Sequence, residues 1–170
     1  MNNKIKILIV DDMPINIQVL AGFLKSEYHV KIAVDGNKAI EMANSENPPE
    51  LILLDVIMPA PDGFEVCRIL KSSDKTKHIP IIFITAKKDE KDEAKGLKLG
   101  AADYISKPFK PAIVKARIKT QLELKHSNDS LKQALKEVNN LKTHNTICQD
   151  CMTKLCTDCR LKMLKKIDKS

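Results

Sequence analysis

Polar residues stand at the ends of several apolar stretches, and their types suit the transfer of a phosphoryl group. ILIV is followed by Asp11 and Asp12, LILL by Asp55, IIFI by Thr85, and ADYIS by Lys107. Three carboxylates can hold a hard divalent ion such as Mg²⁺, and a lysine supplies a compact cation for phosphate. A threonine hydroxyl can donate a hydrogen bond to a phosphoryl oxygen. Together these groups would allow a phosphoryl group to move onto a carboxylate nucleophile.

These residues can meet only if the apolar stretches are strands of one sheet. The hydrophobic pattern predicts strands at 7–10, 29–34, 50–56, 81–85 and 102–106, alternating with helices at 14–25, 37–44, 64–70, 90–99 and from 111 onward. Such alternation is typical of an α/β protein with a doubly wound parallel sheet covered by helices on both faces. In that fold the ligand site lies beyond the carboxyl ends of the strands, where the polar residues fall.

Each acidic residue also has an ordinary explanation as part of a turn. Asp11 and Asp12 would form a solvated turn, with Asp12 capping the helix that Pro14 begins. A lone Asp55 after a strand is often a turn residue as well. Polar residues at every one of these strand ends favour a common site, in which a cation offsets the repulsion between neighbouring carboxylates.

Four motifs make the chain similar to the receiver domains of two-component response regulators. ILIVDDMP, LILLDVIMPAPDGFE, IIFITA and ADYISKPF follow one another in the family's order, and the resemblance covers residues 4 to about 125. It implies a flavodoxin-like sheet of strand order 2-1-3-4-5, to which the sequence adds a long C-terminal helix. It also implies a sensor histidine kinase or phosphotransfer protein as phosphoryl donor, and a downstream protein as target.

The resemblance assigns roles to the acidic residues. Asp55 is the phosphoacceptor by this comparison. Asp12 and Asp55 bind Mg²⁺ directly together with the backbone carbonyl of Ile57, while Asp11 acts through water. A receiver of this kind is not an enzyme acting on other molecules, because it catalyses only its own phosphorylation and dephosphorylation.

Further residues match the family's motifs or depart from them. By resemblance Thr85 and Lys107 contact the phosphoryl group, Tyr104 is the switch aromatic, and the Lys107–Pro108 peptide is cis. Half-buried packing on the sheet is the alternative for Tyr104. Pro61 replaces the apolar residue that the family more often has, which alters the stiffness of the loop. Gly63 is expected to supply a backbone conformation that other residues resist.

Composition limits the classes of protein to which the chain can belong. Its 170 residues suit one domain with an appendage, and 43% hydrophobic residues with no tryptophan predict an aliphatic core. The net charge of +7 is not gathered into a basic stripe, so we expect no nucleic-acid partner. We also expect no signal peptide and no membrane segment, and therefore a cytoplasmic location. The predicted domains are a receiver at 1–125, a helical extension at 126–145 and a basic cysteine-rich tail at 146–170.

The extension carries a pattern typical of a coiled coil. Alternating spacings of four and three separate Leu124, Asn128, Leu131, Leu135 and Val138. This spacing predicts a homodimer formed through residues 120–142. The alternative is a single amphipathic helix that packs on its own domain or stays solvated.

The tail has a cysteine pattern of C-x2-C-x4-C-x2-C, made by Cys148, Cys151, Cys156 and Cys159. Paired CxxC units indicate thiolate ligands for Zn²⁺ or an iron–sulfur cluster, with thiol exchange or plain reduced cysteines as alternatives. The main hypothesis for function is a receiver that takes a phosphoryl group on Asp55 and signals through altered protein contacts. The alternative is a metal or redox sensor adapter in which the cysteines sense and the receiver conveys the signal.

Two other classes of protein fit the sequence poorly. A Mg²⁺-dependent phosphatase with an aspartate nucleophile would carry a DxDxT-like run after the first strand, where this chain has DDMP. A DNA-binding regulator would carry a helix-turn-helix or winged domain, and none is recognisable after Lys125.

Overall fold

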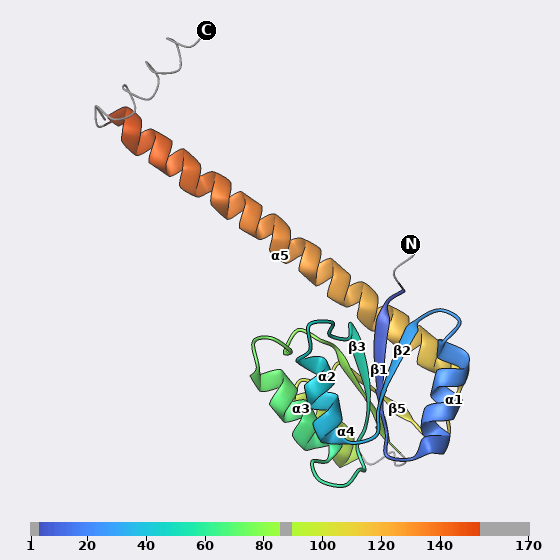
Figure 1. The fold of residues 1–170 in the computed structure, drawn as a ribbon. Coiled ribbons are helices and arrows are strands. Elements are labelled where there is room, and N and C mark those ends of the chain that lie inside the picture. The colour runs from blue at the N-terminus through green and yellow to red at the C-terminus, as the bar shows by residue number, and fades with distance from the viewer. Residues whose placement is uncertain (1–3, 86–89, 154–170) are drawn as a thin grey trace. The chain divides into compact units, whose positions relative to one another are not determined.

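The computed structural model describes residues 4–85 and 90–153, and it describes side chains within 4–85 and 94–140. Strands and helices alternate along this part of the chain (Figure 1). They are β1 (Lys6–Val10), α1 (Pro14–Leu24), β2 (His29–Ala33), α2 (Gly36–Ala43), β3 (Leu51–Asp55), α3 (Gly63–Ser72), β4 (Ile81–Thr85), α4 (Glu90–Lys98), β5 (Asp103–Ser106) and α5 (Pro111–Thr153).

The strands form one parallel sheet in the order β2-β1-β3-β4-β5. β1 lies between β2 and β3, so that Ile9 pairs with Ile32 on one side and Leu53 on the other. The predicted fold class, a doubly wound five-stranded sheet with a long C-terminal helix, is confirmed. Parallel strands need crossover connections, and the helices between them provide these.

Successive strand residues point to opposite faces, and both faces are buried. Leu8 and Leu54 belong to a core that includes residues of α2 and α3, whereas Ile9 and Leu53 belong to a core that includes residues of α1 and α5. This explains why the strands are continuous apolar runs rather than alternating ones. Helices packed on both faces thereby hold the strands in place, and the polar residues begin where these strands end.

Two helices begin at aspartate caps that satisfy backbone amides at their first turn. The Asp35 carboxylate accepts a hydrogen bond from Lys38 N at 2.7 Å, and the Asp62 carboxylate accepts one from Glu65 N at 2.8 Å. A side-chain cap of this kind stabilises a helix by roughly 1 kcal/mol. Asp62 therefore sets the start of α3 on the loop that follows β3.

The chain divides into two compact units, Met1–His126 and Ser127–Ser170. The sheet and the first part of α5 belong to the first unit. The predicted separation of a helical extension from a cysteine-rich tail near residue 145 stays a prediction. Within the described residues, none of the helices is both long and apolar enough to span a bilayer. The cytoplasmic location also stays a prediction.

Candidate functional site

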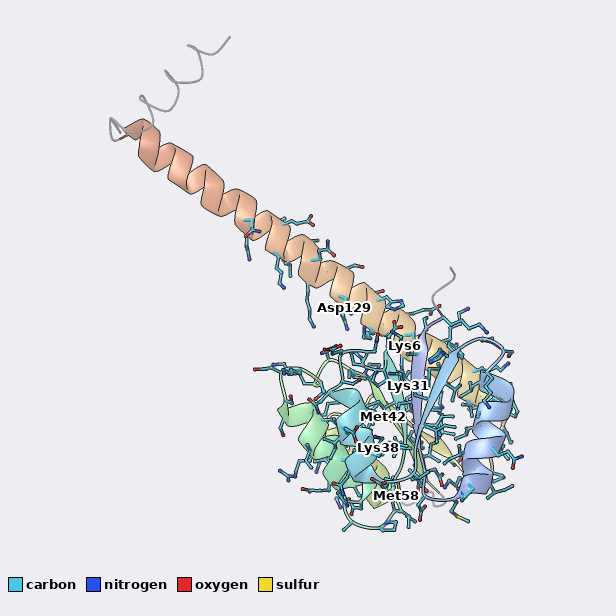
Figure 2. All side chains as sticks on the ribbon, in the orientation of Figure 1. Lys6, Lys31, Lys38, Met42, Met58 and Asp129 are labelled. Carbon is cyan, nitrogen blue, oxygen red and sulfur yellow. The ribbon has the colours of Figure 1, made fainter. Side chains whose placement is uncertain are left out.

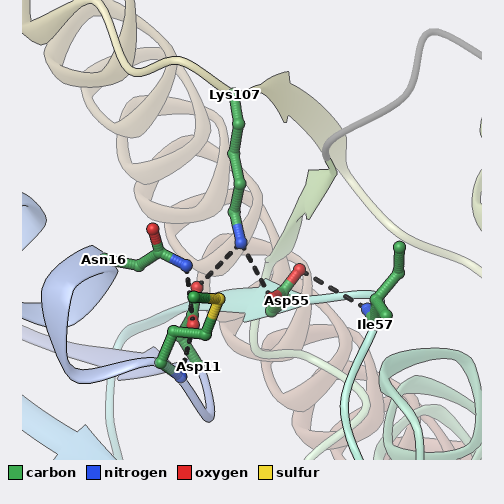
Figure 3. Close-up of polar contacts among 6 residues, drawn as sticks. Asp11, Asn16, Asp55, Ile57 and Lys107 are labelled. Carbon is green, nitrogen blue, oxygen red and sulfur yellow. Dashed lines mark hydrogen bonds and ion pairs between the residues drawn. The ribbon is translucent and has the colours of Figure 1, made fainter.

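The polar residues predicted to share a site gather at the carboxyl edge of the sheet. β3 ends at Asp55 and β4 at Thr85, while Asp11 and Lys107 directly follow β1 and β5. Figure 3 shows Asp11, Asp55 and Lys107 turned toward one another. The parallel strands β1, β3, β4 and β5 thus bring together groups that lie far apart in the sequence.

Lys107 joins the two buried carboxylates. Its ammonium Nζ lies 3.0 Å from Asp11 Oδ2 and 2.8 Å from Asp55 Oδ2. Asp11 is fully buried and Asp55 is 3% exposed. A buried carboxylate without a partner is strongly destabilising, so the shared ammonium is what allows both acids to remain at this edge. The Lys107 backbone N–H also donates to Thr85 O at 2.8 Å, which ties this lysine to the end of β4.

Asp11 is held by its own local contacts as well. Its Oδ1 accepts hydrogen bonds from Met13 N and from Asn16 Nδ2, both at 2.9 Å. The cap residue of α1 is Met13, which makes no side-chain cap bond, so the alternative in which Asp12 caps this helix is wrong. Sequence reasoning missed Asn16. The only available signal was an amide side chain in the first helical turn after the paired aspartates.

The electrostatics of the edge favour a bound cation. Burial raises the pKa of Asp55, the hydrogen bond from Lys107 opposes this, and the nearby Asp11 carboxylate adds to it. Burial alone would lower the pKa of Lys107, but its hydrogen bonds to Asp55 and Asp11 raise it above the usual value. Lys107 therefore stays charged. Three carboxylates and one ammonium leave a formal charge of −2, which one divalent cation offsets.

The acidic residues fit Mg²⁺. Asp11, Asp12 and Asp55 offer carboxylate oxygens that lie within 4.8 Å of one another, with Asp12 exposed to solvent. Mg²⁺ prefers oxygen ligands at about 2.0–2.1 Å and keeps several waters, which an exposed edge allows. Ile57 lies at the same edge, where its N–H donates to Asp55 Oδ1 at 3.4 Å. The use of its carbonyl as a metal ligand stays a prediction.

Thr85 and Tyr104 lie on the neighbouring strands β4 and β5, offset by two residues in the register. Thr85 is 8% exposed and pairs with Ser106, while Tyr104 is half-buried and pairs with Phe83. The Arg117 guanidinium lies 5.5 Å from the centre of the Tyr104 ring. Tyr104 also lines a hollow of about 560 Å³ between β5 and α5. The half-buried packing named as the alternative is thus present, and a switch role for this ring stays a prediction.

Gly63 lies against the backbone of Asp55. A Cβ at this position would meet Asp55 O at 2.1 Å and Val56 Cα at 2.8 Å. The expectation of an unusual backbone conformation is wrong, because Gly100 is the glycine with positive φ in the described chain. The glycine is required by close approach instead. The predicted cis Lys107–Pro108 peptide is confirmed, and Ala60–Pro61 is also cis.

The predicted cysteine cluster lies outside the described side chains. Cys148 and Cys151 fall in the part of α5 whose side chains are outside the described residues, and Cys156 and Cys159 lie beyond the described residues altogether. Within the described side chains, the group found that could hold a metal ion is Asp11, Asp12 and Asp55.

The fold is a doubly wound α/β domain with three carboxylates and a lysine at the carboxyl edge of its sheet. Residues 7–119 match the family model described as the response regulator receiver domain, and the chain belongs to that family. A probable cyclic di-GMP phosphodiesterase of Vibrio cholerae is 42% identical over 125 residues, which are 74% of this chain and 28% of that protein. The chain thus spans little more than a quarter of this curated relative.

Two solved structures are similar to the sheet domain. A putative response regulator from Chloroflexus aurantiacus has a TM-score of 0.68 at 32% identity, covering 71% of this chain and 98% of that one. The receiver domain of a sensor histidine kinase from Pseudomonas aeruginosa has a TM-score of 0.65 at 30% identity, with coverage of 71% and 98%. That structure has a magnesium ion coordinated in its active-site cleft. Its ion agrees with the acidic cluster found here, and together they support Mg²⁺ at this edge.

Proposed function

We propose that this receiver takes a phosphoryl group from a histidine kinase or phosphotransfer protein onto Asp55, and that the modified domain signals through altered protein contacts. The observation that carries the proposal is the position of Asp55. It ends the central strand β3, is nearly buried, and lies 2.8 Å from the only ammonium that also contacts Asp11 among the described side chains. The Lys107 ammonium beside Asp55 can offset the negative charge that a phosphoryl group would add there.

The transfer moves one phosphoryl group between two nucleophiles. An Asp55 carboxylate oxygen attacks phosphorus, a P–O bond forms, and the P–N bond to the donor imidazole breaks, leaving that nitrogen with the electron pair. Mg²⁺, when bound by Asp12 and Asp55 with Asp11 beside them, neutralises charge on the transferring group. The ammonium of Lys107 faces the oxygens of Asp55 and can follow the negative charge onto the phosphoryl oxygens.

Thr85 and Tyr104 are the proposed route from phosphate to surface. The phosphoryl group adds about two negative charges and three acceptor oxygens, which the Thr85 hydroxyl can approach. A shift of Thr85 at the end of β4 alters the space beside Tyr104, and this ring lines the hollow between β5 and α5. A downstream protein that contacts this surface would then distinguish the two states.

The remaining partners are proposed separately from phosphoryl transfer. A second copy of the chain is a proposed partner, bound through the C-terminal helix, and nucleic acid is not among the proposed partners. The match to a phosphodiesterase covers only 28% of that protein, so no catalytic output is proposed for this chain. The alternative of a cysteine-based metal or redox sensor, with Zn²⁺ or an iron–sulfur cluster, is not supported by the family match, which covers residues 7–119.

Phosphorylation by a small donor tests the acceptor. Full-length protein is incubated with acetyl phosphate and Mg²⁺, and the intact mass is measured. The wild type should gain one phosphoryl group and Asp55→Asn should gain none. Asp62→Asn is the matched control, because this exposed aspartate caps α3 in the next loop and should leave incorporation intact. Incorporation into Asp55→Asn at the normal rate would move the acceptor elsewhere.

A further inference from the structure

Each residue of α5 from Ser127 to Asn140 is exposed. Apolar side chains take part in this exposure: Leu131 and Leu135 are each 62% exposed, and Val138 is 46% exposed. Figure 2 shows the side chains standing out along this stretch, with Asp129 labelled. Helices in proteins owe most of their stability to the packing of an apolar face. We therefore expect the apolar side chains of this segment to pack against another surface.

We propose that a second copy of this helix covers the face in a parallel, in-register coiled coil. Counted from Leu124, the residues Asn128, Leu131, Leu135 and Val138 follow spacings of four, three, four and three, which average 3.5 residues and match the two-stranded repeat. At about 100° per residue they lie within roughly 80° of one another on the helix. We call these four residues the seam. A second copy presents the same seam, so its side chains fit between those of the first.

The single polar member of the seam selects the orientation. In a parallel, in-register pair, Asn128 faces Asn128 of the second copy, and the two amides can donate to and accept from each other. In an antiparallel pair, core layers combine different seam positions, so that Asn128 faces an apolar residue such as Val138 of the second copy. Its amide would then be buried without a partner, which disfavours that arrangement.

Charges beside the seam select the same orientation. Lys132 flanks the seam on one side and Ser127 on the other. A parallel pair places Lys132 opposite Ser127 of the second copy, without a clash of like charges. An antiparallel pair places the same flanks together, so that Lys132 meets Lys132 or Lys125 of the second copy. Two independent features of the sequence on this exposed helix therefore favour the parallel pair.

This inference rests on the proposed homodimer but not on phosphoryl transfer, so the two can be tested separately. Full-length protein in reducing buffer is studied by sedimentation over a range of concentrations. The seam variant carries Leu131→Asp and Val138→Asp. The matched control carries Gln133→Asp and Asn140→Asp, which add the same two acids at the same seven-residue separation on the opposite face of the helix.

We expect a wild-type dimer, a control that remains a dimer, and a seam variant that associates at least ~100-fold more weakly, because each 1.4 kcal/mol lost from the interface is a factor of ten. Uptake of phosphate from acetyl phosphate should be equal in the wild type and the seam variant, which ties the loss of the dimer to the helix. A dimer that survives in the seam variant, or a monomeric wild type at every concentration, overturns the inference.

Cross-linking tests the orientation. In chains whose four tail cysteines are replaced by serine, Val138→Cys is oxidised with glutathione disulfide. A parallel, in-register pair brings the two thiols into one layer and yields a covalent dimer, because a disulfide needs Cα atoms about 4.4–6.8 Å apart. An antiparallel pair that matches residue 138 to residue 128 separates the two thiols by about 15 Å along the axis. Cross-linking only between Val138→Cys and Asn128→Cys chains, and not between two Val138→Cys chains, overturns the parallel orientation.

Discussion

Replacing Gly63 by alanine should destabilise the sheet domain, because the added methyl has nowhere to go. The new Cβ would lie 2.1 Å from Asp55 O, whereas ordinary contacts begin at 3.4 Å, so the two backbone segments must separate by about 1.3 Å. Neither atom belongs to a side chain that could turn aside. Overpacking of this kind costs roughly 1–3 kcal/mol. The same movement strains the hydrogen bond from Gly63 N to Val56 O, at 3.1 Å, and its loss adds about 1 kcal/mol.

The expected loss for Gly63→Ala is therefore about 2–4 kcal/mol in the free energy of unfolding. Gly22→Ala is the matched control, because Gly22 lies exposed in α1 and a Cβ there meets nothing within 4 Å. Alanine in this helix should stabilise the protein by roughly 0.5–1 kcal/mol. Both substitutions restrict the unfolded chain in the same way, so the difference between them reports the contact at Gly63.

Urea unfolding followed by tyrosine fluorescence measures this difference. The chain has no tryptophan, and its two tyrosines, Tyr28 and Tyr104, both lie in the first unit, so the signal reports the sheet domain. Because the collision displaces the backbone of Asp55, Gly63→Ala should also slow phosphate uptake from acetyl phosphate, whereas Gly22→Ala should not. Equal stabilisation by the two alanines, with unchanged uptake, would refute the steric argument.

Three further outcomes are expected from the charges at the edge. Burial raises the pKa of Asp55 in the folded protein above its value in the unfolded chain, so the free energy of unfolding falls as pH rises through these two pKa values. Asp55→Asn removes this ionisation and should therefore stabilise the protein in EDTA at neutral pH. In acid, where Asp55 is protonated in both states, this gain should vanish. Mg²⁺ at a hundred times its dissociation constant should stabilise the wild type by about 2.7 kcal/mol, and EDTA should reverse this stabilisation. Asp12→Asn should need more Mg²⁺ for the same shift in thermal melting. Lys107→Met should cost about 3–5 kcal/mol in EDTA, because it leaves two buried carboxylates without the ammonium that offsets their charge. Lys115→Met, which breaks the exposed pair with Glu27, should cost less than about 1 kcal/mol in the same urea titration.

The sequence was sufficient to predict the sheet and the residues that lie at its acidic edge. Continuous apolar runs such as LILL predict strands buried on both faces, and parallel strands place their carboxyl ends at one edge. The sequence alone therefore predicts that Asp11, Asp55 and Lys107 lie together at this edge. Family resemblance, rather than spacing, supplied the strand order and the roles of the residues.

Contacts that depend on the path of a loop could not be predicted in this way. Asn16 reaches Asp11 because α1 begins at Pro14, which places Asn16 in its first turn beside Asp11. Gly63 was singled out for the wrong reason, since a collision between two backbone segments leaves no mark in local sequence. The alternative in which Asp12 caps α1 was equally plausible from residue types, and the chain uses Met13 instead.

The ammonium at this edge comes from the residue that follows β5, the last strand along the chain, which has a consequence for how the protein is made. Lys107 is 96 residues from Asp11 and 52 residues from Asp55 along the chain. During synthesis Asp11 and Asp55 leave the ribosome long before Lys107. An unfinished chain therefore carries two carboxylates that repel each other at the centre of the sheet. Contacts of such long separation are slow to form, because closing a long loop costs entropy before the contact is made. On the proposed function, nascent or truncated chains that end before β5 lack the Lys107 ammonium, and we expect them to compete poorly with finished protein for the phosphoryl donor.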